Sequence, residues 1–298
     1  MSSSASIHAG KLYGLTLVLP LGLELYSVRQ YLPTDYAGTL KKIGALGYRE
    51  VESAHGYFDH SVAEVKQAMQ DAKLNLVSAA YSFDDLHRQL DQILEFNKAL
   101  GVGYIICVSP GFKDPLRIKN MNPADTVNAL TLDDWRWSAE AFNRMGEKTH
   151  AAGMKFGYHN HTVEFRRTDG VVPYVELLRL TDPSKVTMEM DCGWVIVAGG
   201  NPSDYLREYP TRISMLHVKD FKRIDPAAPT KDSVSAELGQ GVIDYRPIFE
   251  AAGKTGNVKH CFVEQEEFDV PPMESLAIDA AYMRKLGAVQ VSARTLPI

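Results

Sequence analysis

A strand, a helix and a second strand follow one another in residues 74–109, LNLVSAAYSFDDLHRQLDQILEFNKALGVGYIICVS. Leu74–Tyr81 and Tyr104–Ser109 are short apolar runs, and apolar residues at consecutive positions are typical of strands in a parallel sheet, which is buried on both faces. Between them, Asp84–Leu100 has apolar residues at helical spacing and is followed by Gly101, a residue that commonly ends helices. The pattern predicts two parallel strands joined by a right-handed crossover.

The same alternation extends in both directions along the chain. Further strands are expected at Leu21–Ser27, Tyr48–Glu52, Met154–His159, Val186–Asp191, Ile213–Val218 and Cys261–Glu264. Further helices are expected at Asp35–Leu46, His60–Lys73, Leu132–Ala152, Val171–Leu180, Pro202–Tyr209, Tyr245–Ala252 and Met273–Leu286. Eight such units predict a single α/β domain over residues 1–298, a (β/α)8 TIM barrel. The barrel is expected over about 21–290, with 1–20 as an N-terminal extension.

An open, doubly wound sheet is the alternative architecture. No G-x-G-x-x-G motif stands between a strand and a helix, which weakens a dinucleotide-binding sheet. Two long connections, Pro110–Asn128 and Lys222–Gly241, are expected to be loops. Because they follow the fourth and seventh strands, they are expected to lie on the catalytic face of a barrel.

Composition excludes several classes of protein. The 298 residues are 45% hydrophobic and 23% charged, which is ordinary for a globular domain and unlike a disordered chain. A net charge of −5 argues against a nucleic-acid partner, since phosphate binding needs a basic face. The sequence contains no run of 18 apolar residues, so no membrane-spanning helix is expected. The protein is expected to be cytoplasmic, with the apolar stretch Leu12–Leu25 leaving a secretory signal as the alternative.

The active site of a TIM barrel lies at the carboxyl ends of its strands. Polar and charged side chains stand at those ends or just beyond them, namely Tyr26, Glu52, Tyr81, His159, His161, Glu164, Asp191, His217, Lys219 and Glu264. A mixed set of imidazoles and carboxylates suits Mn²⁺, Co²⁺, Zn²⁺, Fe²⁺ or Mg²⁺. The alternative is that each residue is merely hydrogen-bonded, solvated or a helix cap, but this is harder to sustain for four consecutive strand ends.

The motifs at these positions resemble a known family. They are GLELYSVR (22–29), GYHNHTVEF (157–165), MEMDCGW (188–194), LHVKDF (216–221), LGQGVIDY (238–245) and FVEQE (262–266). Together they resemble the xylose-isomerase-like barrel superfamily, also called the sugar phosphate isomerase/epimerase or AP-endonuclease-2-like family. The resemblance extends from about Leu21 to Leu286.

The resemblance implies a divalent metal ion held by residues from strands five to eight. Asp191, His217 and Glu264 match three of the family's four ligands. Many members supply the fourth ligand as the Glu of Glu-Asn-His at the end of strand five, where this chain has His159-Asn160-His161. Two residues can replace it: Glu164, which we favour, and His159.

The resemblance also implies proton transfer next to the carbonyl of a sugar or keto-sugar through an enediolate. Glu264 or His161 is expected to move the proton, and Lys219 to act as a base or to clamp an oxyanion. Glu52, Tyr81, His161 and Tyr26 are expected to bind substrate, with Glu52 rather than Glu50 facing the barrel.

The main expectation is a metal-dependent sugar isomerase or epimerase. A metal-dependent lyase or dehydratase acting on a keto-sugar or 3-keto-glycoside is the first alternative, since both reactions begin with the same enolate. A non-catalytic sugar-binding barrel is the second alternative. An endonuclease is disfavoured by the acidic charge. A homo-oligomer is plausible by the same resemblance, although no apolar pattern identifies an interface.

Overall fold

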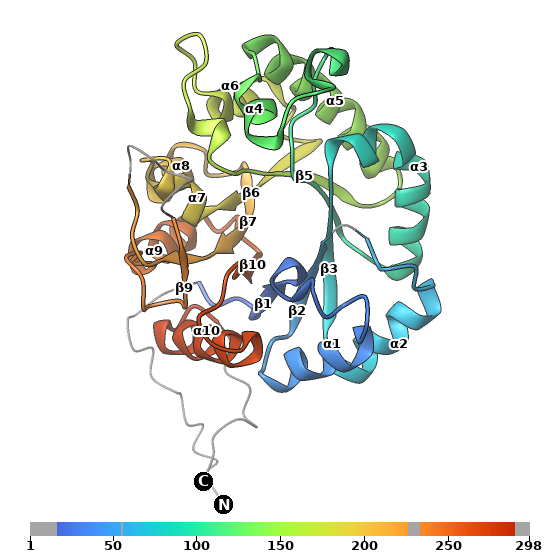
Figure 1. Cartoon of the computed structure of the whole chain (residues 1–298), viewed down its shortest axis with the longest axis vertical. Coiled ribbons are helices and arrows are strands. Elements are labelled where there is room, and N and C mark those ends of the chain that lie inside the picture. The colour runs from blue at the N-terminus through green and yellow to red at the C-terminus, as the bar shows by residue number, and fades with distance from the viewer. Residues whose placement is uncertain (1–16, 55, 226–232, 290–298) are drawn as a thin grey trace, which may run out of the picture.

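A closed barrel of eight parallel strands forms the centre of the molecule, and helices surround it (Figure 1). The computed structural model describes residues 17–54, 56–225 and 233–289. The order of strands around the barrel is β1-β10-β7-β6-β5-β4-β3-β2. These strands are β1 (Gly22–Glu24), β2 (Glu50–Ala54), β3 (Asn75–Tyr81), β4 (Tyr104–Cys107), β5 (Lys155–His159), β6 (Val186–Asp191), β7 (Ile213–Val218) and β10 (His260–Val263). The predicted (β/α)8 barrel is confirmed.

The helices that cover the barrel agree with the predicted ones to within a few residues. They are α1 (Tyr36–Ala45), α2 (Val62–Ala72), α3 (Phe83–Leu100), α5 (Leu132–Ala151), α6 (Pro173–Leu180), α8 (Pro202–Glu208), α9 (Arg246–Thr255) and α10 (Pro272–Leu286). Their ends follow from local chemistry. Ser61 and Glu64 form a reciprocal capping box at the start of α2, and Gly101 ends α3 with a φ of 84°, where a side chain would be strained.

Apolar and aromatic side chains close the amino-terminal half of the barrel interior. Val77, Ile106, Met215 and Phe262 pack there in one cluster. The His260 ring lies 5.6 Å from the ring of Tyr104, across the interior between opposite strands. The barrel is therefore a filled core that is open only toward the carboxyl ends of its strands.

Glu50 also faces the interior, which corrects the expectation that only Glu52 does so. Its Oε2 lies 2.8 Å from His260 Nδ1. The reason is that side chains alternate along a strand, so residues two apart share a face. Glu50 sits lower in the barrel, and Glu52 sits near its mouth.

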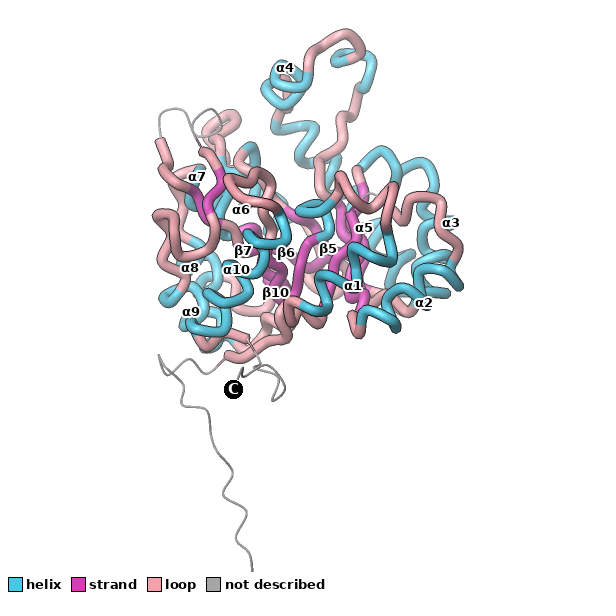
Figure 2. Tube along the Cα trace, turned by 60° about the horizontal axis from the view of Figure 1, so that its bottom comes forward, coloured by secondary structure: helices cyan, strands magenta, loops and turns pink. Residues whose placement is uncertain are grey.

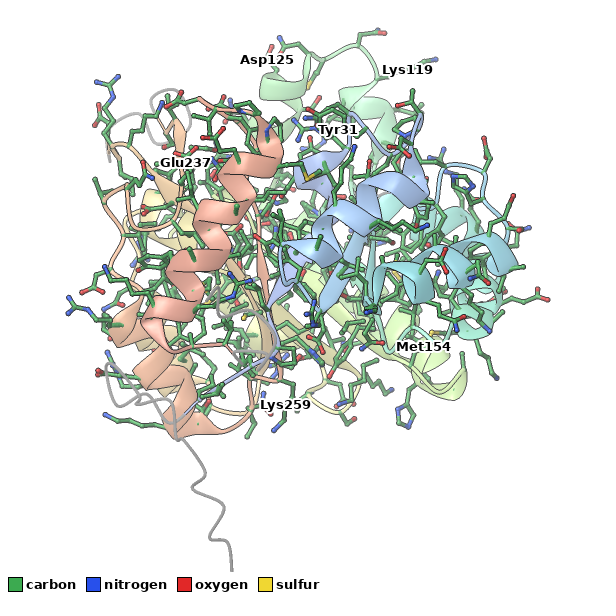
Figure 3. All side chains as sticks on the ribbon, turned by 90° about the horizontal axis from the view of Figure 1, so that it is seen from below. Tyr31, Lys119, Asp125, Met154, Glu237 and Lys259 are labelled. Atoms are coloured by element: carbon green, nitrogen blue, oxygen red, sulfur yellow. The ribbon has the colours of Figure 1, made fainter. Side chains whose placement is uncertain are left out.

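The two ends of the barrel are identified by residues labelled in Figure 3. Met154 and Lys259, which directly precede β5 and β10, lie at one end of the molecule. Lys119 and Asp125, which follow β4, lie at the opposite end. That end carries the loops in which an active site is expected.

The connection predicted as a loop over Pro110–Asn128 is more structured than expected. It contains a 3₁₀ helix, η2 (Pro115–Ile118), and a short helix, α4 (Pro123–Asn128). Proline at the first helical turn and the N-cap side chains of Asp114 and Asn122 explain why both helices form. The segment that carries α4 projects from the barrel mouth (Figure 2).

Three other expectations also need correction. The first strand is short, because the chain turns into a 3₁₀ helix, η1 (Leu25–Val28), with Glu24 as its N-cap. A helix that we did not predict, α7 (Cys192–Val197), directly follows β6 and is capped by Asp191. The predicted loop Lys222–Gly241 contains a short strand, β9 (Ser235–Ala236), which pairs antiparallel with β8 (Asp220–Phe221) just before the loop, while residues 226–232 lie outside the described residues.

The predicted N-terminal extension lies mostly outside the described residues, which begin at 17. Leu19 pairs with Val289 near the other end of the described chain, and its N–H donates to the Ala288 carbonyl at 2.9 Å. No helix in the described part of the chain is long and apolar enough to cross a membrane.

An ion-paired carboxylate between α5 and α6 gives a stability prediction. Glu176 accepts hydrogen bonds from Arg179 and Arg136, and these lower its pKa to about 2. We expect Glu176→Gln to lower the free energy of unfolding by about 1 kcal/mol at pH 7. A depressed folded-state pKa contributes stability that is present above the unfolded pKa and is lost as the pH falls toward the folded one. The difference from wild type should therefore shrink from about pH 4.5 downward.

Urea unfolding at several pH values measures this difference. Glu147→Gln is the matched control, because Glu147 pairs with Lys185 at an exposed position and should contribute little. A Glu176→Gln difference that persists unchanged at about pH 3 would contradict the assignment.

Candidate metal centre

Four side chains from four neighbouring strands meet at the barrel mouth. His159 ends β5, Asp191 ends β6, His217 lies one residue before the end of β7, and Glu264 directly follows β10. Each offers one nitrogen or oxygen atom, and these atoms lie within 4.8 Å of one another. All four residues are buried. The structure thus brings together four of the five residues named as ligands from sequence.

The backbone around Asp191 fixes the direction of its carboxylate. As N-cap of α7, it accepts a hydrogen bond at Oδ1 from the Trp194 N–H, at 2.8 Å. Its own N–H donates to Asn160 Oδ1 at 3.1 Å, and its carbonyl accepts from Asn160 Nδ2 at 3.3 Å. Oδ2 is buried, accepts no hydrogen bond from the described residues and faces Lys219 Nζ at 3.2 Å. One oxygen therefore caps a helix while the other remains for a ligand.

His217 connects this group to further carboxylates. Its Nδ1 lies 2.9 Å from Glu264 Oε2, and its Nε2 lies 3.2 Å from Glu52 Oε1 and 3.3 Å from Glu189 Oε2. Metal-binding histidines usually donate their second ring N–H to a carboxylate, which fixes the ring. We therefore assign Nδ1 as the atom that faces the ligand position and Nε2 as the donor to Glu52.

Lys219 compensates part of the negative charge of the carboxylates at the barrel mouth. Its ammonium lies 2.6 Å from Glu266, 3.0 Å from Glu264 and 3.2 Å from Asp191. Burial alone would lower the pKa of Lys219, but Asp191 and Glu264 raise it above its ordinary value, so the side chain is charged. Lys219 is not among the residues that line the inner cavity described next. Its geometry suits a positioning residue, and the expected role as a base or oxyanion clamp stays a prediction.

A polar cavity of about 230 Å³, here called the inner cavity, is lined by three of the four side chains, those of His159, His217 and Glu264. Four carboxylates and three imidazoles line it, together with Tyr26 and Trp194. Glu52 and His161, which we expected to contact substrate with Tyr26, are among the lining residues. The cavity has the size and polarity for a small hydroxylated molecule.

Tyr81, also expected to bind substrate, points away from the inner cavity and toward the surrounding helices. It follows Ala80, which lines the inner cavity, and adjacent residues of a strand point to opposite faces. Its hydroxyl accepts a hydrogen bond from Asn97 Nδ2 of α3 at 2.9 Å. Tyr81 is therefore part of the layer between strand and helix.

Glu164, the favoured first ligand, lies outside the four-residue group. It sits on η3 (Val163–Phe165), where it accepts hydrogen bonds from the Tyr158 hydroxyl at 2.5 Å and from the His161 N–H at 2.9 Å. Tyr158 and His159 point to opposite faces of β5, so a carboxylate bound to Tyr158 is on the helix side of the strand. His159 therefore occupies the position that we had assigned to Glu164, and Glu164 fixes the loop that carries His161.

Glu189 is a buried residue that the sequence analysis missed, as it missed the cavity-lining Glu24, Trp194 and Glu266. It is fully buried, its Oε2 lies 3.3 Å from both His159 Nδ1 and His217 Nε2, and neither oxygen has a hydrogen bond of good geometry within the described structure. Its position two residues before Asp191 placed it on the same face of β6, and this spacing was the available signal. Glu189 faces the second nitrogen of both imidazoles.

Burial and neighbouring charges give the acidic groups different protonation states. Burial and Glu52 raise the pKa of Glu189 to about 8, and burial raises that of Asp191 to about 6. Burial would also raise the pKa of Glu264, but Lys219 and His217 hold it well below its ordinary value. Glu24 has a strongly raised pKa through burial and the adjacent Glu52, and these two form a second possible group with His217.

The residues of the first group fit a divalent cation. Two imidazoles and two carboxylates converge, and the buried Oδ2 of Asp191 has an ion pair with Lys219 but accepts no hydrogen bond from the described residues. Several carboxylates are gathered around one ammonium in a buried site, which is costly without further positive charge. A bound cation would offset this charge and use the unsatisfied oxygen.

The barrel and this group of donors define a TIM barrel with a candidate metal centre. The chain belongs to the family described as xylose isomerase-like TIM barrel, whose sequence profile matches residues 40–286. This confirms the resemblance inferred from the motifs.

Individual relatives add detail about the family. The inosose dehydratase of Lacticaseibacillus casei is 24% identical over an alignment of 238 residues, and the match covers 74% of this chain and 78% of the relative. A sugar phosphate isomerase/epimerase from Parabacteroides distasonis ATCC 8503 superposes with a TM-score of 0.72 at 23% identity, covering 95% of this chain and 96% of that one. The IOLI protein, solved with a zinc atom, superposes with a TM-score of 0.71 at 14% identity, covering 90% and 98%.

The geometry predicts which side chain binds metal at the end of β5. We expect His159→Gln to weaken Zn²⁺ or Mn²⁺ binding by at least about tenfold, because it removes one of the converging donors. Glu164→Gln should change affinity by less than about threefold, because its carboxylate is bound to Tyr158 and the His161 backbone. Isothermal titration calorimetry measures both. A larger loss in Glu164→Gln would return the ligand position to that residue.

Proposed function

We propose that this chain is a divalent-metal-dependent lyase that eliminates a β-oxygen substituent from a cyclic keto-sugar or a related polyhydroxy ketone. The observation that carries the proposal is the buried group of His159, Asp191, His217 and Glu264, three of which line a small polar cavity. A dehydratase of an inosose, which is a cyclic polyhydroxy ketone, is among the relatives.

The proposed ligands are His159, Asp191, His217 through Nδ1, and Glu264. Two imidazoles with two carboxylates suit Zn²⁺, Mn²⁺ or Co²⁺ better than Mg²⁺, which prefers oxygen ligands. An ion held there would supply Lewis-acid polarisation of a substrate carbonyl, which acidifies the neighbouring C–H bond.

His161 is the proposed proton carrier. It lines the inner cavity, it is outside the four-donor group, and its ring lies beside those of His159 and Trp194, at 4.9 and 6.5 Å between centroids. Glu164 holds the backbone of His161 in place. In this position the imidazole can accept the proton from the carbon next to the carbonyl and return it to the departing oxygen.

The other groups orient the substrate and hold the site. Glu52 and Glu266 present carboxylates to the cavity and can accept hydrogen bonds from substrate hydroxyls. Trp194 contributes an aromatic wall. Lys219 keeps Asp191 and Glu264 ionised and in place through its two ion pairs.

Elimination is favoured over isomerisation by the residue at the end of β5. The epimerases that this chain resembles use two metal-bound glutamates on opposite faces of the substrate. This chain has His159 at the equivalent strand end, which leaves Glu264 as the one glutamate of the four-donor group. Removal of the proton next to the carbonyl, which is the first step of both elimination and isomerisation, remains part of the proposed reaction.

The proposal is tested with protein loaded with Zn²⁺ or Mn²⁺ and an inosose as substrate. We expect loss of water to an unsaturated product, detected by NMR, and a fall in kcat of about 100-fold or more in His161→Gln at unchanged metal content. The matched control is His150→Gln, because His150 is exposed at the end of α5.

The outcomes separate the alternatives. Deuterium uptake from solvent at the carbon next to the carbonyl, without loss of a substituent, would indicate an isomerase or epimerase instead. Saturable binding with neither exchange nor elimination would indicate a sugar-binding barrel.

A further inference from the structure

A second, larger cavity adjoins the inner one and has a different chemical character. Its volume is about 750 Å³, against about 230 Å³ for the inner cavity. Val108 and His161 line both, so the two cavities adjoin at these residues. We call the larger one the outer cavity.

The walls of the outer cavity are largely aromatic and aliphatic. Phe83 and Trp137 lie 5.2 Å apart between ring centroids, and Phe112, Leu130 and Val163 complete much of the lining. These residues come from α3, α5 and the segments that follow β4 and β5. Apolar atoms make up most of the wall surface, although polar side chains such as His87 and Thr162 are also among the lining residues.

The segment that carries α4 forms one side of the outer cavity and is anchored at its base. The Lys113 N–H donates to Asp134 Oδ1 at 3.0 Å, and Arg117 pairs with the other oxygen of Asp134. The Gly111 N–H donates to Ser138 Oγ at 3.0 Å. These contacts fix the cavity wall in place, as is usual for ligand pockets.

Charged groups near the outer cavity are already engaged. Lys113 is the one lysine among its lining residues, which include no arginine, and it pairs with Asp133 at 2.8 Å. Glu164 is bound to Tyr158 and the His161 backbone. An anionic group such as a phosphate would find no available cation there.

The glycine-containing turn after β7 also has no free N–H groups of the kind that bind a phosphate, because they already donate to a carboxylate. The N–H groups of Gly239, Gly241 and Ile243 donate to the carboxylate of Asp220 at 3.0 to 3.1 Å. That carboxylate takes the place that an anion would need.

We infer that the substrate of this site carries an uncharged, apolar ring as the substituent that leaves, and that the outer cavity binds this ring while the inner cavity binds the keto-sugar. The inference rests on the proposed lyase function and specifies its substrate class as a keto-glycoside with an aromatic aglycone. A free cyclic polyol would occupy the inner cavity and leave the apolar walls uncovered.

The chemistry of elimination fixes the position of the ketone. For the glycosidic oxygen at C1 to be β to the carbonyl, the ketone is at C3 and the proton leaves from C2. The C2–H electron pair forms the C1–C2 double bond, the C1–O bond breaks, and the oxygen leaves with a proton as a phenol or alcohol. No oxidant or reductant is consumed, and an oxidation of the C3 hydroxyl must supply the substrate. His161, which lines both cavities, stands where this bond would lie.

Binding of glycosides that cannot react tests the outer cavity separately from catalysis. We expect phenyl β-glucoside to bind the Zn²⁺-loaded protein at least about tenfold more tightly than methyl β-glucoside, because the ring buries apolar surface. Trp137→Ala should remove most of this preference and leave methyl β-glucoside binding unchanged. Calorimetric titration measures both.

A second pair of variants, at exposed positions, tests the outer cavity in case Trp137→Ala does not fold. Val127 lines the outer cavity at 45% exposure, and Val242 is 56% exposed elsewhere. Val127→Asp should reduce the phenyl preference by at least about threefold, since a carboxylate disfavours an apolar neighbour. Val242→Asp should leave it unchanged. Equal affinity for the two glycosides, or equal effects of the two substitutions, would overturn the inference.

Turnover of the two 3-keto-glucosides separates this inference from the proposed function. A higher kcat/KM for the phenyl compound, reduced by Val127→Asp, supports both. Elimination from the two compounds at equal kcat/KM retains the lyase and overturns the aromatic subsite. A phenyl preference in binding with no elimination retains the subsite and overturns the lyase.

Discussion

Five carboxyl groups, two imidazoles and one ammonium are buried together at the mouth of the barrel, and the site depends on how their charges are balanced. They are Glu24, Glu52, Glu189, Asp191, Glu264, His159, His217 and Lys219. A parallel barrel makes this arrangement possible, because the inward-facing residues at the ends of neighbouring strands converge. Lys219 compensates part of the negative charge through Asp191 and Glu264, and the remaining deficit of positive charge is what a divalent cation would supply.

The two cavities would divide the recognition of the proposed substrate. The inner cavity is small and polar and is lined by three of the proposed metal ligands, whereas the outer one is three times as large and mostly apolar. The outer cavity owes its shape to the α4 segment, which projects from the mouth (Figure 2). Barrels with one fold can thus differ in substrate through the loops that follow the strands. His161 lies at the boundary, where a bond between the two halves of a substrate would be broken.

Much of this organisation could be predicted from the sequence, because strand and helix periodicity is a local property. The eight units followed from apolar spacing, and the convergence of Asp191, His217 and Glu264 followed from their place at strand ends. The choice between Glu164 and His159 could not be made, because it depends on how η3 folds back against Tyr158. The orientation of Tyr81 followed from strand alternation, but only once the inward-facing position was known. α4 and the outer cavity are tertiary features to which no sequence motif pointed.

The most direct test of the account is the metal content of the purified protein, determined by elemental analysis on wild type and Asp191→Asn together. The account predicts about one divalent ion per chain in the wild type, lost in the variant, with an unchanged circular dichroism spectrum in both. Absence of metal from the wild type, even after incubation with Zn²⁺, Mn²⁺ or Co²⁺, would contradict it. Full retention of metal in Asp191→Asn would contradict the proposed ligand set.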